Sequence, residues 1–278
     1  MGLLVALGIL SSSCTNIFSN FADETRDQAI VVDVQTSLDN KDYNTALTQI
    51  STLSASYQTR RDVLALWASA YAGRGGLDFI TLANNVQSIG ATNLFLFMMQ
   101  NFDSGTTAKM SDLLAAQNKI LSISTTMSTL SNDELMELVV IAIGNMGTIM
   151  SKYADPGATG SPTIASTCAA FPAWATPLPA APSDAVEQFG VSLNYAIAAL
   201  SRLNTNGVTF GVSVGNVSTL CASLAAIPAL ASYSFCGVYD ASTFTANQYK
   251  GILSLMNEKT AGIGLGTCNG DIVACACP

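Results

Sequence analysis

Histidine is absent from the 278-residue chain, and charged residues make up only 11% of it. Because histidine is the usual general base and the commonest metal ligand, its absence excludes Ser-His-Asp and Cys-His catalysis. The 11 lysines and arginines form no basic stripe, so we expect no nucleic-acid partner. The chain also lacks a CxxC pair, which argues against a cysteine zinc site. These absences predict a protein with no catalytic residues, no metal and no cofactor.

The chain is rich in apolar residues. Hydrophobic residues reach 49%, the mean hydropathy is +0.38 and the net charge is −8. The length allows one large or two small domains with a sizeable core. With so few charges, the surface must be covered by uncharged polar residues or be partly buried against partners.

The N-terminus carries a short apolar run, from Gly2 to Leu10, followed by three serines and Cys14. A bilayer span needs about 20 residues, so this run fits the core and cleavage site of a secretory signal instead. The alternative is an ordinary buried N-terminal helix with a free cysteine. The residues around Cys14 resemble the lipobox of bacterial lipoproteins, in which the cysteine becomes the lipidated first residue.

The lipobox resemblance implies a signal peptide over residues 1–13, a lipid such as palmitate on Cys14 and a tether over residues 14–22. Two features depart from the family pattern: Ser11 stands where the family usually has leucine, and the first basic residue is Arg26. Thr15 is not the aspartate that retains many lipoproteins at the inner membrane. The resemblance therefore implies the periplasmic face of the outer membrane.

Six cysteines remain once Cys14 is set aside, and all lie after residue 167. In an oxidising compartment we expect three disulfides, of unassigned connectivity. Cys275 and Cys277 are too close to pair comfortably with each other, so each should reach back to another partner. The six residues are Cys168, Cys221, Cys236, Cys268, Cys275 and Cys277.

Apolar residues recur at helical spacing through residues 23–153, which predicts an all-α domain. Ser131 and Glu134 form a capping-box sequence before a long apolar run, predicting a core helix from Asn132 to about Tyr153. Asn93–Gln100 is apolar on every side and should be a buried helix. The other predicted helices are Asp23–Leu38, one from Tyr43, Arg61–Gly73, Leu77–Ile89 and 106–123.

Residues 27–90 resemble tetratricopeptide repeats (TPR). Ala68, Tyr71 and Gly75 fall on the family's small residue, tyrosine and turn glycine, and Tyr43 and Ala46 stand one 34-residue period before Leu77 and Ile80. The resemblance implies helical hairpins, although Ile80 replaces the expected alanine. An unrelated antiparallel bundle has the same periodicity.

Residues 154–183 hold six of the eight prolines, which predicts an irregular segment and a domain boundary. Residues 184–278 should form a helical, loop-rich part stapled by disulfides, with helices from Ser183 and over Thr243–Asn257. No charge occurs from Leu203 to Tyr239, so this stretch is a candidate partner surface; an inner apolar layer is the alternative. The possible partner contacts are Trp174, Leu220, Tyr233 and Phe235.

Other patterns that suggest chemistry have plainer explanations. Asp133 and Glu137 could be an acid/base pair, but their place in the first helical turn favours dipole compensation. The glycine-rich stretches Gly73–Gly76 and Gly262–Gly266 lack the ending of a phosphate-binding loop. Trp67 is expected in the core.

We therefore expect a non-catalytic, lipid-anchored accessory or scaffold subunit of a membrane complex, with an envelope membrane protein as partner. A periplasmic small-molecule binding protein beside a transporter is the alternative, and a deep pocket lined by Trp67 or Phe95 would favour it. An enzyme that uses carboxylates alone would need Asp or Glu pairs from distant segments meeting in a cleft.

Overall fold

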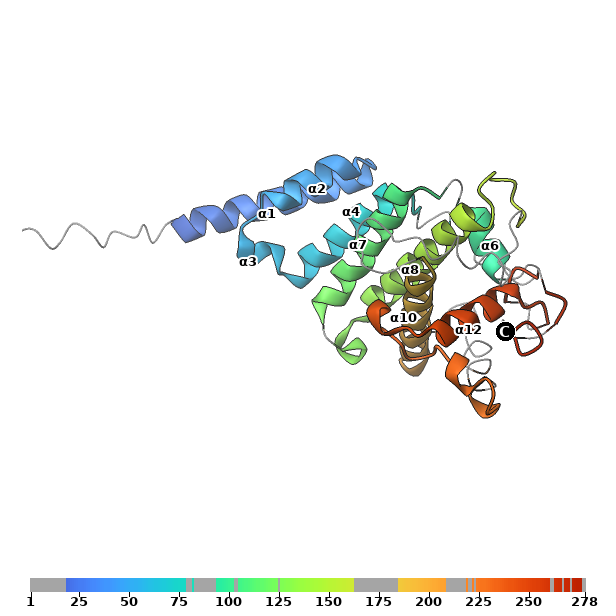
Figure 1. Cartoon of the computed structure of the whole chain (residues 1–278). Coiled ribbons are helices and arrows are strands. Elements are labelled where there is room, and N and C mark those ends of the chain that lie inside the picture. The colour runs from blue at the N-terminus through green and yellow to red at the C-terminus, as the bar shows by residue number, and fades with distance from the viewer. Residues whose placement is uncertain are drawn as a thin grey trace, which may run out of the picture.

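The computed structural model describes residues 19–78, 82, 94–102, 105–124, 126–162, 185–208, 219, 222, 224–260, 263–266, 268–270 and 272–276. These residues form an all-α protein, and none of them lies in a strand (Figure 1). The α-helices are α1 (Ser19–Asp39), α2 (Tyr43–Ser51), α3 (Ala55–Gln58), α4 (Arg61–Arg74), α6 (Leu94–Asn101), α7 (Thr107–Ile123), α8 (Asn132–Tyr153), α10 (Ala185–Thr205) and α12 (Ala246–Asn257). Three short 3₁₀ helices are η2 (Met127–Thr129), η4 (Ala231–Tyr233) and η5 (Ala241–Thr243).

Side-chain caps explain where several helices begin. Ser131 and Glu134 form the predicted capping box, and α8 begins at Asn132 as expected. Thr245 and Gln248 form a second capping box at the start of α12. Each box satisfies backbone N–H groups that a helix start leaves without partners, which fixes the first turn in place.

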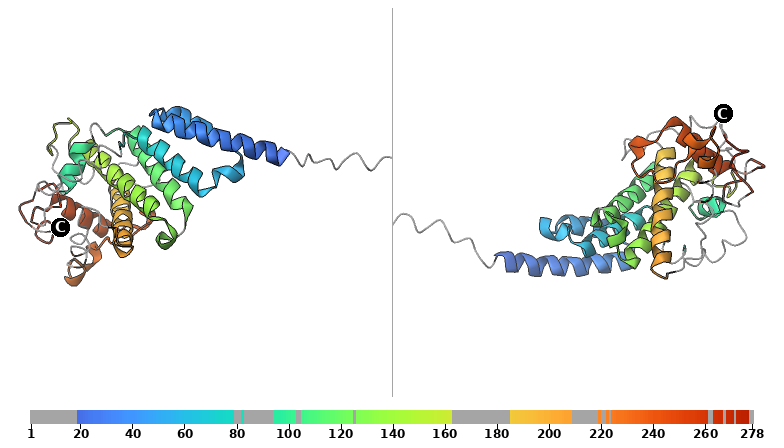
Figure 2. Two further views of the ribbon diagram at one scale, coloured as in Figure 1. Left: turned by 180° about the vertical axis from the view of Figure 1, so that it is seen from behind. Right: turned by 90° about the horizontal axis from the view of Figure 1, so that it is seen from below.

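The helices pack in chain order, each against the next. α1 packs on α2, α2 on α4, α4 on α7, α7 on α8 and α8 on α10, while α6 also rests on α8. Figures 1 and 2 show this order as a progression from the α1–α2 pair at one end to α12 and the C-terminus at the other. The fold is therefore a succession of helical hairpins.

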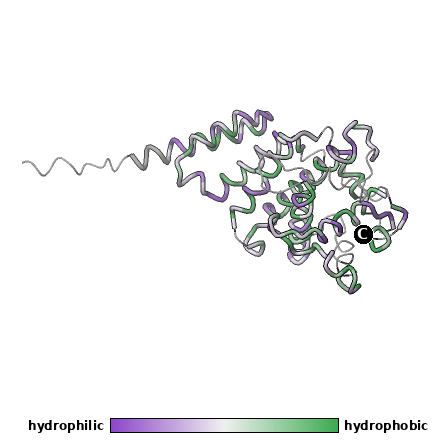
Figure 3. The backbone as a smooth tube through the Cα atoms, viewed as in Figure 1, coloured by the Kyte–Doolittle hydropathy of each residue, from purple (hydrophilic) through white to green (hydrophobic). Residues whose placement is uncertain are grey.

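Two hydrophobic cores follow from this arrangement. A small core joins α1, α2, α3 and α4 around Val34, Ile50 and Tyr57. The main core surrounds α8 and takes side chains from α6, α7, α10 and α12. Figure 3 shows hydrophobic and hydrophilic positions alternating along the helices, as expected when one face of each helix is buried.

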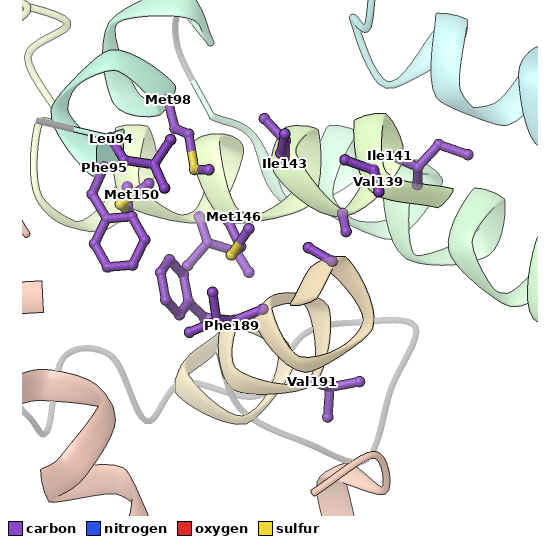
Figure 4. Close-up of a cluster of buried hydrophobic side chains, with 14 of the residues drawn as sticks. Leu94, Phe95, Met98, Val139, Ile141, Ile143, Met146, Met150, Phe189 and Val191 are labelled. Carbon is purple, nitrogen blue, oxygen red and sulfur yellow. The ribbon is translucent and has the colours of Figure 1, made fainter. Parts of the chain in front are cut away.

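Helix α8 is the centre of the main core. Of the residues that the structure describes, it is the one helix long and apolar enough to cross a membrane, yet 83% of its most apolar window is buried inside the protein. Met146 and Met150 of α8 pack near Phe95 of α6 and Phe189 of α10 (Figure 4). The two phenyl rings meet edge to face with centroids 5.1 Å apart, a favourable geometry for aromatic pairs.

Several predicted elements agree with the structure and others differ. α2, α7 and α8 begin within a residue of their predicted starts, and α6 is buried as expected. α1 begins at Ser19, four residues before the predicted Asp23, so it takes in part of the predicted tether. The single-turn helix α3 was missed, because a four-residue helix has no periodicity to detect. Most of the predicted helix Leu77–Ile89 and of the segment 154–183 lies outside the described residues.

Candidate functional site

The predicted partner contacts occupy different environments. Phe235 is fully buried and belongs to the main core, so its side chain is closed to a partner in this conformation. Asn194 on α10 fixes the loop around Phe235: its amide donates to the carbonyls of Phe235 and Val238, and its oxygen accepts from Gly237 N–H. Tyr233 is half-buried against the same core. Trp174 and Leu220 lie outside the described residues.

The described part of the uncharged stretch reaches the surface beside this loop. Tyr239 is 44% exposed, and its ring lies 5.0 Å from that of Tyr195 on α10. Pro228 and Ala229 are also exposed, whereas Leu203 and Leu224 are buried in the main core. The described part of the uncharged stretch is therefore partly exposed, as a partner surface would be, and partly buried, as an inner apolar layer would be.

The tail is held by a disulfide between Cys268 and Cys275, whose Cα atoms are 5.9 Å apart. Cys236 is also disulfide-bonded. Cys14, Cys168, Cys221 and Cys277 lie outside the described residues. The buried Glu258 fixes the other side of the tail, because its carboxylate accepts from the backbone N–H groups of Ile263 and Gly264 at 2.9 and 2.8 Å.

Charged side chains connect α4 to α8. Arg61 forms a two-pronged ion pair with Glu134 and also donates to the carbonyl of Thr129 at 2.7 Å. Glu134 is thus shared between Arg61 and the capping box of α8. Burial opposes ionisation of Glu134, but the hydrogen bonds from Arg61 and Ser131 outweigh it and lower its pKa.

Glu137 stands one turn further along α8 and behaves differently. It is not in the first turn, so the predicted role in dipole compensation is wrong for this residue; Asp133 and Glu134 occupy that turn. Its carboxylate accepts a hydrogen bond from Ser69 of α4 at 2.7 Å. Burial raises the pKa of Glu137, the Ser69 hydrogen bond lowers it and the nearby Glu134 charge raises it, so that the net pKa is about 7. A carboxyl group that titrates near neutrality therefore lies at the contact of α4 with α8.

Three polar side chains linked by hydrogen bonds cross the main core where α7, α8 and α10 meet. Asn145 donates to the Ser192 hydroxyl at 2.8 Å, and that hydroxyl donates to the Gln117 carbonyl oxygen at 2.9 Å. All three side chains are buried. Gln117 Nε2 and Asn145 Oδ1 have no hydrogen-bond partner among the described residues. These hydrogen bonds favour one arrangement of the three helices, and the two unpaired polar atoms lower the stability of the core.

A ligand pocket lined by Trp67 or Phe95 would favour the small-molecule alternative, but neither residue lines the two cavities described below. Trp67 packs against the small core under the ammonium of Lys119, which lies 3.2 Å from the ring centroid. Burial there lowers the pKa of Lys119. Phe95 is fully enclosed in the main core.

A polar cavity of about 190 Å³ lies where the end of α4 meets α6, α7 and α8. A smaller cavity of about 50 Å³ adjoins it and shares Gly76, Asn101 and Phe102. Gly76 has φ +93°, a left-handed conformation that favours glycine. The larger cavity is lined by Gly75, Gly76, Asn101, Phe102, Lys109 and Thr148. No sequence motif marks it, because its walls come from four separate helices.

Within the described part of the chain, no group of three or more Cys, Asp or Glu side chains could hold a metal ion. No protein-family profile, curated protein or solved structure matches the chain.

Proposed function

We propose that this chain is a non-catalytic lipoprotein, anchored through Cys14 at the periplasmic face of the outer membrane, that acts as an accessory or scaffold subunit of a membrane protein complex. The observation that carries the proposal is the position of α1. Its N-terminal end extends beyond the neighbouring helices (Figures 1 and 2), and it begins five residues after Cys14.

The length of α1 and of the segment before it suits a spacer between a membrane anchor and the rest of the protein. The four residues between Cys14 and Ser19 span at most about 15 Å, so the start of α1 would remain close to the bilayer. A helix of 21 residues is roughly 30 Å long. An acyl group on Cys14 would therefore hold the body of the protein away from the membrane surface, where its other faces could meet a partner.

The outer face of α1 and the succession of hairpins supply partner surface. Val32 of α1 is a large apolar side chain that is 59% exposed. A TPR-like arrangement, which the sequence resembles over residues 27–90, would use such stacked hairpins for binding proteins. An envelope membrane protein is the partner class that fits a chain held at the membrane.

The alternative, a periplasmic small-molecule binding protein beside a transporter, receives less support. The larger cavity described above has about 190 Å³, whereas pockets for drug-sized ligands usually have about 300 to 1,000 Å³. A deep pocket lined by Phe95 would have favoured this alternative, but the Phe95 side chain is packed in the core.

Metabolic labelling tests the anchor. The full chain is produced in a bacterium with an outer membrane and fed an alkyne-bearing fatty acid, and the purified protein is coupled to a fluorophore. We expect label on the wild type and none on Cys14→Ser. The double variant Cys268→Ser/Cys275→Ser is the matched control, because it loses two cysteines but keeps Cys14 and should be labelled. Label retained by Cys14→Ser, or missing from the wild type, would contradict the proposal.

A further inference from the structure

We propose that the exposed face of α1 pairs with the same face of a second copy of this chain, with the two helices antiparallel. The inference goes beyond the scaffold function and does not rest on the lipid anchor, so its failure would leave that proposal standing. α1 is accessible for such a contact, because its N-terminal end extends beyond the neighbouring helices (Figures 1 and 2). It packs on α2 and α4 through one face, and the opposite face is exposed to solvent.

The first observation is a stripe of uncharged side chains along the exposed face. Thr25, Ala29, Val32 and Thr36 are all exposed, and their spacing of four, three and four residues is that of a coiled-coil seam. Val32 is 59% exposed, more than any other large hydrophobic side chain that the structure describes. The Thr36 hydroxyl donates to the Val32 carbonyl at 3.0 Å. The stripe can therefore pack against a second helix without leaving this hydroxyl unpaired.

The second observation is the pair of opposite charges on one edge of the stripe. Arg26 and Asp33 are both exposed and stand seven residues apart, two turns along the same edge of α1. Within the part of the chain that the structure describes, neither side chain forms an ion pair or a hydrogen bond. Both charges are therefore available to a partner.

These two charges are self-complementary about a two-fold axis. In a two-fold dimer, a contact of Arg26 with Asp33 of the second copy is matched by the reciprocal contact of Asp33 with Arg26. In an antiparallel helix pair, the residues on one edge of the seam face those on the same edge of the other helix, so both ion pairs form in one register. That register places Ala29 beside Val32 of the second copy. A parallel pair would instead place Asp33 beside Gln28 and would form neither ion pair.

The rest of the exposed face is compatible with this arrangement. Gln28 and Gln35 lie on the other edge of the stripe, are exposed and carry no charge. In the same register they face each other across the seam, where their amides can exchange hydrogen bonds. The body of each copy lies on the opposite face of its own α1, so the helix pair separates the two bodies. The helical hairpins would stay available for the proposed membrane partner.

The dimer also allows both chains to be anchored. The N-terminal ends of the two α1 helices lie at opposite ends of the pair, roughly 30 Å apart. When the two-fold axis stands perpendicular to a membrane, both ends lie at the same height, and each tether can reach the surface. In such a dimer α1 would lie along the membrane, whereas the α1 of a single chain can stand upright on it.

Sedimentation equilibrium of the full chain in mild detergent tests the pairing. We expect a monomer–dimer equilibrium for the wild type. Arg26→Asp or Asp33→Arg alone turns both symmetric contacts from attraction into repulsion, so each should weaken dimerisation about tenfold or more. The double variant Arg26→Asp/Asp33→Arg exchanges the two charges and restores both ion pairs. It should therefore dimerise within about threefold of the wild type.

A matched control makes the test specific. Arg60→Asp makes the same change of charge at an exposed residue outside α1 and should leave the dimerisation constant within about twofold of the wild type. Two chains that only share a detergent micelle through their anchors would associate equally in every variant. The proposal is overturned if the chain stays monomeric, if the single reversals dimerise like the wild type, or if the double variant associates as weakly as the single ones.

Discussion

Replacing Ser192 with alanine should destabilise the protein far more than removing a hydroxyl usually does. The Ser192 hydroxyl is fully buried and joins two buried amides, one from α8 and one from α7. Each amide already has one atom without a partner. Loss of the hydroxyl would leave a second atom of each unpaired, in a place where neither can reach water.

An unpaired buried polar group costs about 1–3 kcal/mol, so two of them should lower the free energy of unfolding by about 2–5 kcal/mol. Urea unfolding followed by circular dichroism measures the change, on the assumption of a two-state transition. Ser201→Ala on the same helix is the matched control, because Ser201 is exposed and should change stability by less than about 0.5 kcal/mol.

The triple variant Gln117→Leu/Asn145→Leu/Ser192→Ala sharpens the test. It removes the polar side-chain atoms of all three residues together and leaves none of them unpaired. It should therefore lower the free energy of unfolding less than Ser192→Ala alone, although it changes more atoms. If Ser192→Ala proves as mild as Ser201→Ala, the buried hydrogen bonds of Ser192 do not hold the three helices together.

Three further perturbations follow from the contacts at the α4–α8 junction and the tail. Glu137→Gln should be more stable than the wild type at pH 8 by about 3 kcal/mol and should lose most of this advantage as the pH falls toward 5. With a folded-state pKa of about 7, raised above the usual value for glutamate, ionisation of Glu137 disfavours folding as the pH rises. Arg61→Met should lower the free energy of unfolding more than Arg60→Met does, because the carboxylate that Arg61 pairs with is nearly buried, whereas both members of the Arg60–Asp62 pair are exposed. Without reductant, the double variant Cys268→Ser/Cys275→Ser should have a free energy of unfolding about 2–3 kcal/mol below that of the wild type. With reductant, the double variant and the fully reduced wild type should be equally stable.

Urea unfolding measures all three, across a pH series for the first. A Glu137→Gln advantage that is the same at pH 5 and pH 8 would refute titration of this carboxyl group. Equal costs for the two arginine variants would mean that the Arg61 ion pair is no stronger than an exposed one. Peptide mapping by mass spectrometry checks the disulfide directly, and a different partner for Cys275 would contradict the structure.

Local sequence signals predicted much of the fold. The capping box at Ser131 fixed the start of α8, and the all-round apolar character of Asn93–Gln100 correctly indicated a buried helix. These predictions succeeded because the causes lie within a few residues of their effects. The sequence left the disulfide connectivity open; it disfavoured only a Cys275–Cys277 bond, and the structure pairs Cys275 with Cys268.

Contacts between distant segments could not be predicted in this way. Glu137 meets Ser69, which lies 68 residues earlier, and this contact rather than the helix dipole determines its environment. Phe235 was a candidate partner contact because its stretch carries no charge, with an inner apolar layer as the alternative; the ring is buried, and Asn194, 41 residues earlier, donates to the Phe235 carbonyl. The polar cavity beside Gly76 is lined by residues from four separate parts of the chain, so no single stretch of sequence carries a signal for it.

The most direct test of the proposed function is co-purification. Native membranes are extracted in mild detergent, the full chain is recovered through a tag after Pro278, and the proteins that accompany it are identified and quantified. We expect a membrane protein in stoichiometric amount, which is lost when Cys14→Ser releases the chain from the membrane. Recovery of the chain alone, still membrane-bound, would contradict the role of a complex subunit.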